Sequence, residues 1–378
     1  MRATKGCGCA VAVLVVVLGA AGYAGWKYAL PWWKTKPPPP SGGELQVHIL
    51  DVGPINGDAI LIISPTGKTV LIDAGDAGKG KIVLDAMKRY NVQQLDYFIA
   101  THPHPDHLGG ADEVIKATKV LNVIDNGLAS GTPESSVAAN KPADLKGAKK
   151  PVMRKPDKLA SVTRFIDEYK DAVSKSGAHY EKAEPGKKFD LGGGAQLTIL
   201  APSLPYFTKE QMKTGNEPNA NSVLARLDYG AFSILLPADA EEQTEHRLLT
   251  KDVNLQADIL KVAHHGSKYA TAADFVARVK PKVAIISCGE WNRYGHPAQV
   301  VLDRLKAANV KIYRTDLQGE ISILTKGKEN DYSIKTAKEA KSDLWIGRLA
   351  QKDDSSRAGF IAYGDFGPPP KTVNRAKP

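Results

Sequence analysis

The stretch that organises this chain is Thr101-His-Pro-His-Pro-Asp-His-Leu-Gly-Gly110, which holds three of the nine histidines within six positions. Neutral imidazoles and carboxylates are the ligands that zinc and similar divalent metals prefer. A residue before proline favours extended backbone, and both His102 and His104 precede a proline. Their side chains can therefore project to nearly the same side. Asp106 and His107 then point elsewhere, which suits a second metal beside the first.

The setting of this stretch favours a metal site over a histidine-rich surface loop. It follows the apolar, strand-like segment 95–100 and precedes a short helix expected at 112–118, and such loops commonly build sites on an α/β scaffold. Two later apolar strands also end in possible ligands, the first in Asp239 and the second in His264 and His265. Either end alone could be a turn or a helix cap. Together with the loop they supply the bridging carboxylate and further imidazole that a dinuclear site needs.

Composition and charge limit the class of protein. A hydrophobic content of 42% over 378 residues is globular, and the three cysteines form no disulfide framework or zinc knuckle. The net charge of +10 is peripheral, because residues 1–43 carry five bases and no acid, and residues 331–378 carry nine bases and six acids. This distribution argues for proximity to a membrane or polyanion more than for a particular substrate.

The two ends of the chain differ from its middle. An uncharged apolar run at 10–25, followed by tryptophans, predicts a signal anchor or a cleaved signal peptide over residues 1–33. Residues 34–43 form a Pro/Gly linker. We expect the globular domain at 44–330 and a polar, partly disordered tail at 331–378. The membrane-anchored or secreted chain would then place its catalytic domain in the periplasm or outside the cell.

Within the middle, strand and helix patterns recur in two halves that each mix β with α. Residues 126–158 interrupt them as a polar insertion, with seven bases and two acids between Lys141 and Lys158. This insertion reads either as a solvated surface loop or as a basic rim near a site for a negatively charged substrate. An amphipathic helix is predicted at 159–176.

Seven motifs in this order resemble the metallo-β-lactamase superfamily, and within it the metallo-hydrolase domain of ComEC-type competence proteins. They begin with Leu50-Asp-Val-Gly53 and Gly57-Asp-Ala59, and include the ligand loop. The others are Leu71-Ile-Asp-Ala-Gly75, Asn221-Ser-Val-Leu224, Leu236–Asp239, Lys261–Ser267, and Ile286-Ser-Cys-Gly289 with Tyr294-Gly-His-Pro297. The resemblance implies an α/β (α+β) fold. This fold is a four-layer αβ/βα sandwich with a dinuclear metal site at one edge, preceded here by one N-terminal hydrophobic helix.

The resemblance also implies roles for single residues. His102 and His104 would hold the first metal, Asp106 and His107 the second, and Asp239 would bridge them. The pair His264-His265 would complete the shell, with the ligand of the two left open. The resemblance also implies catalytic roles for Asp106, Asp239, His265 and His296. Asn221 and Ser222 would bind the substrate. Asp58 and Asp73 would support the ligands from outside the shell.

The chain departs from the family in two ways. The broader superfamily has another histidine between the loop and the bridging aspartate, and here only His179 lies in that interval, where it reads as the start of a strand. ComEC proteins also carry a large multi-span channel, whereas this sequence offers at most one span. DNA uptake is therefore not implied.

The expected function is that of an exported hydrolase with two divalent metal ions, zinc or alternatively manganese, and a metal-activated water. A phosphodiester, in DNA or in an envelope polymer, is the expected substrate. One alternative is a metallohydrolase of another ester, thioester or lactone. The other is a non-catalytic envelope protein that binds polyanions, with salt-dependent binding that survives EDTA. The membrane is expected as a partner through the N-terminal segment, and no obligate protein partner is predicted.

Overall fold

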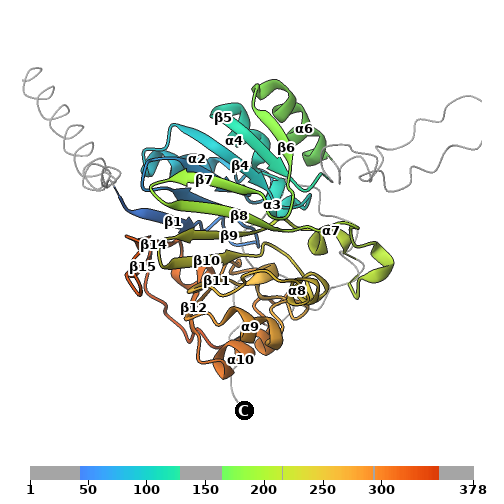
Figure 1. Cartoon of the computed structure of the whole chain (residues 1–378), viewed down its shortest axis with the longest axis vertical. Coiled ribbons are helices and arrows are strands. Elements are labelled where there is room, and N and C mark those ends of the chain that lie inside the picture. Colours follow the sequence, from blue (N-terminus) through green and yellow to red (C-terminus); the bar gives the residue numbers. More distant parts are fainter. Residues whose placement is uncertain (1–42, 128–163, 215, 293, 349–378) are drawn as a thin grey trace, which may run out of the picture.

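The computed structural model describes residues 43–127, 164–214, 216–292 and 294–348. Two β-sheets pack face to face, and helices cover the outer face of each (Figure 1). The prediction of a mixed α/β sandwich is therefore confirmed. The predicted signal segment 1–33 and nearly all of the linker and the basic insertion lie outside the described residues. Among the residues that are described, no helix has the length and apolar character to cross a membrane.

The first sheet has eight strands in the order β15-β14-β1-β2-β3-β4-β5-β6. Their bounds in chain order are β1 Leu45–Ile49, β2 Ile60–Ile63, β3 Thr69–Ile72, β4 Gln94–Ala100, β5 Lys119–Asp125, β6 His179–Lys182, β14 Ile321–Thr325 and β15 Tyr332–Thr336. The second sheet has seven strands in the order β13-β12-β11-β10-β9-β8-β7. Their bounds are β7 Lys188–Gly192, β8 Ala195–Ala201, β9 Leu224–Tyr229, β10 Phe232–Leu236, β11 Ile259–Lys261, β12 Val283–Ile286 and β13 Lys311–Arg314.

The helices divide between the two outer faces, as Figure 1 shows with α4 and α6 at one end of the view and α9 and α10 at the other. Those that cover the first sheet are α2 Gly80–Arg89, α4 Ala111–Ala117 and α6 Arg164–Ser176. Those that cover the second are α8 Glu242–Leu249, α9 Ala273–Val279 and α10 Gln299–Ala307. Short helical segments connect the remainder: α3 Pro105–Leu108, α7 Glu217–Ala220, α11 Thr315–Gln318, and the 3-10 helices η2 Lys209–Gln211 and η3 Ala263–Gly266.

Alternation along the strands explains the four layers. In β2, Ile60 and Ile62 enter the core between the sheets, whereas Leu61 and Ile63 face the helices outside. In β10, Ile234 faces the inner core and its neighbour on the chain turns toward α8 and α9. Successive strand residues point to opposite faces of a sheet. Strands that are buried on both faces therefore read as continuous apolar runs.

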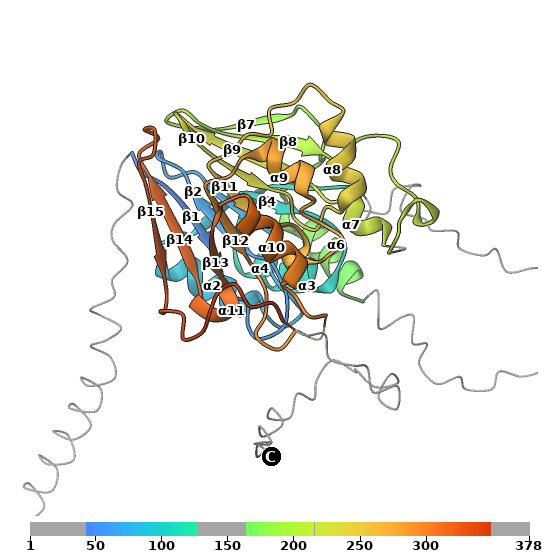
Figure 2. The ribbon, with the colours of Figure 1, turned by 90° about the horizontal axis from the view of Figure 1, so that it is seen from below.

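The first sheet continues past residue 330, where we expected the domain to end. Strand β15 pairs antiparallel with β14 and forms the outer edge of the molecule (Figure 2). Beyond it, Leu344 and Trp345 pack against the core beneath α10, and Arg314 donates hydrogen bonds to the carbonyl oxygens of Leu344 and Ile346 at 2.8 and 2.7 Å. An edge strand with one solvated face carries little apolar signal, which is why the sequence reads as a polar tail.

Parallel pairing sets the place of the site. Strands β3 to β6 pair in parallel, and so do β10 to β13. Polar residues follow the carboxyl ends of four of these strands: Asp73 follows β3, His102 follows β4, Asp239 follows β10, and His265 follows β11. Ligand sites of open α/β sheets lie at such carboxyl ends. The two sheets bring theirs together at one edge of the sandwich.

Candidate metal centre

The loop after β4 places the first candidate ligands. His104 is extended, with φ −101° and ψ 149°, and precedes the first turn of α3, where Pro105 provides a fixed φ. Nε2 of His102 and Nδ1 of His104 lie 3.0 Å apart, close enough to share one cation. Asp106 and His107, in the helical turn, both approach Nε2 of His265 in η3, at 3.3 Å. The ring of His107 also lies 4.2 Å from that of His102, and both belong to one candidate donor group with Asp239. The division of the loop into two pairs of ligands stays a prediction.

Backbone contacts hold this loop against its neighbours. The amide of Asp58 donates to the carbonyl oxygen of Asp106 at 3.1 Å, and the amide of Ala74 donates to that of His107 at 2.8 Å. A Cβ added to Gly110 would lie 2.4 Å from the carbonyl oxygen of Ala74. Glycine at that position therefore lets α4 begin directly against the loop that carries Asp73.

Asp73 determines the orientation of two histidines. Its Oδ2 accepts hydrogen bonds from Nδ1 of His107 and from the hydroxyl of Thr101, both at 2.7 Å. The Thr101 oxygen in turn lies 3.0 Å from Nδ1 of His102 and accepts its proton. Carboxylates that hold the outer nitrogen of a histidine in this way leave Nε2 free for a metal. Burial raises the pKa of Asp73, and the contacts with His107 and Thr101 oppose that rise.

The pair His264-His265 divides into two roles. Nδ1 of His265 donates to the carbonyl oxygen of Ser287 at 2.9 Å, so its Nε2 is the free nitrogen. That Nε2 lies 3.3 Å from Asp106 Oδ2 and 3.5 Å from Asp239 Oδ2. The His265 side chain is 1% exposed, whereas that of His264 is 17% exposed. The geometry therefore favours His265 as the metal ligand.

His264 lies at the border of the centre. Its Nε2 is 3.7 Å from Asp239 Oδ2, and its Nδ1 is 3.7 Å from Glu241 Oε1. Asn219 approaches the same ring with its amide nitrogen at 3.2 Å from Nε2. Burial, only partly offset by Asp239, lowers the pKa of His264 to about 4. The imidazole is therefore neutral near pH 7 in the absence of a metal.

The donor set fits divalent cations. Three-residue groups with ligand atoms within 4.8 Å of one another are His102–His107–Asp239, Asp106–His107–His265, Asp58–Asp239–His265 and Asp58–Asp73–His107. Oδ1 of Asp239 is buried and accepts no well-formed hydrogen bond, with Nε2 of His107 at 3.3 Å as a close nitrogen. A buried carboxylate oxygen in this state needs a compensating cation. His104 stands beside His102 but belongs to none of these groups.

In the absence of a metal, protonated histidines and one lysine partly compensate the negative charge of the buried carboxylates. Burial opposes protonation of His265, but Asp239, Asp106 and Asp58 outweigh it and raise its pKa to about 10. His107 has a raised pKa for a similar reason, with Asp239 as the largest favourable contact. Burial would raise the pKa of Asp58, yet the ammonium of Lys261 beside it holds that pKa below its ordinary value. A cluster of buried carboxylates that stabilises neighbouring positive charges in this way is typical of metal sites.

The two predicted substrate-binding residues are buried: Asn221 forms hydrogen bonds with other segments, and the hydroxyl of Ser222 has no hydrogen-bond partner among the described residues. The amide nitrogen of Asn221 donates to the carbonyl oxygens of Phe207 and Glu217, both at 2.9 Å, and its Oδ1 accepts from the amide of Phe207. The structure therefore uses Asn221 to position the segments before and within α7, and does not offer its side chain to a substrate. Ser222 is fully buried. His179 lies on β6, as the start of a strand, away from the centre.

Asn219 and Glu241 belong to the centre but were not predicted. Oδ1 of Asn219 is buried without a hydrogen-bond partner, and Glu241 accepts a hydrogen bond from the hydroxyl of Thr214 at 2.9 Å. Burial raises the pKa of Glu241 to about 7. The available signal was the asparagine-rich run 216–222, in which only tertiary contacts separate Asn219 from Asn221.

A cavity of about 450 Å³ opens beside His264 and His296. The His296 ring lies 5.5 Å from that of His264. Burial, and then repulsion from the neighbouring His264 ring when that ring is protonated, lower the pKa of His296 to about 3. The volume is in the range of small-molecule sites. Of the residues predicted for the site, His264 and His296 are those that reach this cavity.

Comparison with known proteins agrees with these features. Residues 52–144 match the family model of the metallo-beta-lactamase superfamily. The chain is 27% identical over 310 residues to ComE operon protein 3 of Bacillus subtilis, an alignment that covers 77% of this chain and 34% of that protein. It is 26% identical over 284 residues to Recombination protein 2 of Haemophilus influenzae, covering 74% of this chain and 28% of that protein.

Among solved structures, a metallo-beta-lactamase of Cronobacter sakazakii is 15% identical, with a TM-score of 0.34 over 55% of this chain and 72% of that chain. The chain spans about a third of the length of the curated relatives it matches. Competence protein ComA of Neisseria gonorrhoeae is 24% identical over 280 residues, an alignment that covers 74% of this chain and 32% of that protein. The resemblance drawn from the seven motifs is thereby confirmed: residues 52–144 match the superfamily model, and the chain is similar to part of longer proteins that include a competence protein.

Proposed function

We propose that this chain is a hydrolase that holds two divalent cations and cleaves phosphodiester bonds. The observation that carries the proposal is the donor set around Asp239. Three imidazoles, those of His102, His107 and His265, have their Nδ1 atoms engaged by neighbours and their Nε2 atoms directed inward. Fixed orientation of this kind is a feature of built metal centres rather than of chance histidine clusters.

His102 and His104 would hold one cation, and Asp106, His107 and His265 the other, with Asp239 between them. Zinc suits this set of imidazoles and carboxylates, and manganese is the alternative. Cys288 does not contribute, because it is buried in the core beneath α10. Such cations supply a nucleophile from water near neutral pH and polarise a phosphoryl oxygen.

The protein's own groups would align the reactants. Asp239 accepts a hydrogen bond from the attacking water and so sets its direction. His264, between Asp239 and the cavity, contacts the leaving side of the substrate, and Glu241 holds its ring in place at 3.7 Å. Asp106 and His265, whose side chains contact each other, would hold the second cation in position. His296 borders the cavity.

The names of the relatives indicate which substrate should be tested first. Two of them are named for competence and recombination, so DNA comes first among the phosphodiesters, before phosphorylated envelope polymers. Export through residues 1–33 is part of the same proposal, and cell fractionation tests it. A chain recovered entirely in the cytosolic fraction would contradict export.

The central experiment compares the wild-type protein with Asp239→Ala on bis-p-nitrophenyl phosphate and on DNA, with metal content measured in parallel. Asp274→Ala serves as the matched control, since Asp274 is an exposed aspartate on α9. We expect two metal equivalents and cleavage for the wild type and the control, and loss of both in Asp239→Ala. Equal cleavage rates for all three proteins would refute the proposal. Turnover of a lactone or thioester panel instead would select a different hydrolase, and EDTA-resistant polyanion binding without any turnover would select a binding protein.

A further inference from the structure

The lining of the cavity beside the metal centre includes Glu241 and His264, and also aromatic and basic residues that the proposed chemistry does not use. Tyr269 and Tyr294 both line it, and they are 38% and 58% exposed. Only six large hydrophobic side chains within the described ranges are this exposed, and two of them meet here. Tyrosines in such a position present an aromatic surface to a ligand and keep a hydroxyl in water.

A row of rings joins this surface to the metal centre. The ring of Tyr294 is stacked on that of His296, with centroids 5.8 Å apart and planes at 19°. The His296 ring lies 5.5 Å from that of His264, which in turn lies 6.2 Å from that of His265. A flat group on the outer face of Tyr294 would therefore be held beside the reacting bond and not at it.

Cationic groups line the same cavity. Nζ of Lys268 lies 5.0 Å from the ring centroid of Tyr269, and Lys268 forms no ion pair with the acids of the described chain segments. Arg348 also lines the cavity, with its guanidinium held by Asp316 at 2.7 and 2.9 Å. An aromatic face next to a lysine matches the alternation of base and phosphate in a nucleic-acid strand.

We propose that the cavity formed by Tyr269, Tyr294, Lys268, His296 and Arg348 is a base subsite, which binds the nucleobase next to the bond that is cleaved. The base stacks on Tyr294, and Lys268 contacts the phosphate that follows. This inference rests on the proposed phosphodiester hydrolysis and specifies its substrate as a polynucleotide with accessible bases. Because base faces are covered in a duplex, the subsite selects single-stranded over double-stranded substrate.

Binding of single-stranded oligonucleotides tests the subsite. One strand carries 2-aminopurine, and a second of equal length carries abasic residues at the same positions. Affinities are measured for the full-length protein in EDTA, where cleavage cannot compete, and again with Ca²⁺. We expect the wild type to bind the base-bearing strand about ten- to a hundredfold more tightly than the abasic strand, with quenching of the 2-aminopurine fluorescence.

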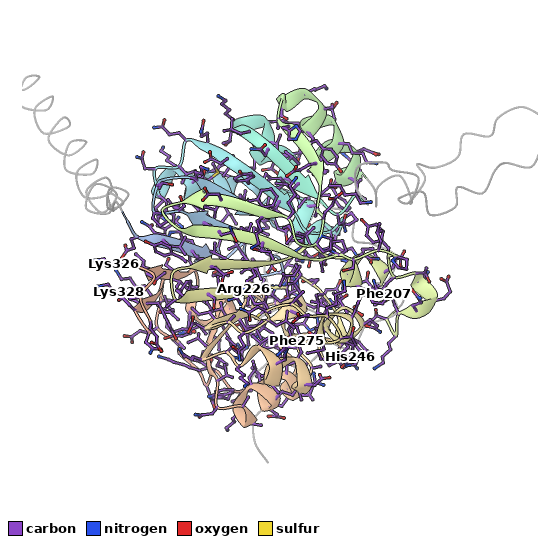
Figure 3. All side chains as sticks on the ribbon, in the orientation of Figure 1. Phe207, Arg226, His246, Phe275, Lys326 and Lys328 are labelled. Carbon is purple, nitrogen blue, oxygen red and sulfur yellow. The ribbon has the colours of Figure 1, made fainter. Side chains whose placement is uncertain are left out.

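The variants separate stacking from charge. Tyr294→Ala should lose the preference for bases, whereas Tyr294→Phe should keep it, because the ring remains. Lys268→Ala should weaken both strands alike and reduce the salt dependence of binding. Lys328→Ala is its matched control, because Lys328 is exposed and lies at the end of the molecule opposite Phe207 and α7 (Figures 1 and 3). Thermal unfolding of each variant verifies its fold.

The subsite is overturned if the wild type binds both strands equally, if Tyr294→Ala keeps the preference, or if no base-bearing strand binds in either condition. Equal affinity with strong salt dependence would indicate a polyanion site without base recognition. The assay needs no turnover, so its result is separate from the activity assay. A base preference without cleavage would refute the hydrolase and leave a base-binding site without a catalytic role. Cleavage without a base preference would refute the subsite and leave the hydrolase standing.

Discussion

Oδ2 of Asp73 accepts a hydrogen bond from Nδ1 of His107 at 2.7 Å, while Oδ1 accepts one from the amide of Thr101 at 2.8 Å. Both carboxylate oxygens are thus engaged by donors of the ligand loop. This engagement favours a role for Asp73 in orienting His107 over a role as a metal ligand. Residues of this kind are needed for affinity as much as the ligands themselves.

Replacing Asp73 with asparagine should weaken metal binding by about 10- to 100-fold. The amide keeps the size of the side chain but loses the charge that fixes the proton on Nδ1 of His107. Competition with a fluorescent chelator measures the change. Asp274→Asn, on the exposed surface of α9, should leave the affinity unaltered. An unchanged affinity in Asp73→Asn would show that His107 does not depend on this carboxylate.

His264→Ala and His265→Ala should differ in metal content. His265 directs its free Nε2 at Asp106 and Asp239, so His265→Ala should lose at least one metal equivalent. His264 lies on the cavity side, and His264→Ala should retain both equivalents and lower kcat. Inductively coupled plasma analysis of the two purified variants decides the matter. Loss of metal from His264→Ala alone would reverse our assignment.

Lys261→Met should destabilise the metal-free protein by about 3–5 kcal/mol. The Lys261 ammonium is fully buried and pairs with Asp58, which is buried as well. Removing one partner leaves the other as an uncompensated charge. Urea unfolding in EDTA measures the loss. The double variant Lys261→Met/Asp58→Asn should recover part of it, and a double variant less stable than the single one would contradict the explanation.

His48 should make the protein less stable in acid. Burial, together with the nearby charge of Arg89, lowers the pKa of His48 to about 3. The unfolded chain takes up this proton near pH 6.5, whereas the folded chain does so only near pH 3. The stability from this group is therefore complete above pH 6.5 and falls as the pH drops toward 3. At pH 5 the loss amounts to about 2 kcal/mol.

Urea unfolding at pH 7 and pH 5 tests this linkage in His48→Gln. The glutamine can still bond to Ser322, which lies 2.8 Å from Nδ1 of His48, and it does not titrate. The variant should lose about 2 kcal/mol less than the wild type between the two pH values. His179→Gln, on the exposed start of β6, serves as control. Equal losses in His48→Gln and the wild type would exclude His48 as the source.

Local patterns were enough to predict most elements of the fold. Apolar runs such as 60–63 and 232–236 are strands because both of their faces are buried, and turn residues mark their ends. The edge strand β15 was missed for the converse reason. Its side chains alternate between half-buried and exposed, and only Tyr332 and Ile334 pack against the core. Two apolar positions in a polar segment are a weak strand signal.

The histidine loop was recognisable as a metal site from its sequence alone, because residue types and spacing limit which side chains can share an ion. Its proline spacing also predicted that His102 and His104 face away from Asp106 and His107, whereas the structure brings the ring of His107 within 4.2 Å of that of His102. The tertiary structure decided the rest. It favoured His265 over His264 as ligand, assigned Asn221 to loop packing, and brought Asn219, Glu241 and the tyrosines to the border of the centre. These outcomes depend on which imidazole nitrogen forms a hydrogen bond with the backbone and on which side chains are exposed to solvent. Contacts between segments that are distant in the sequence determine both.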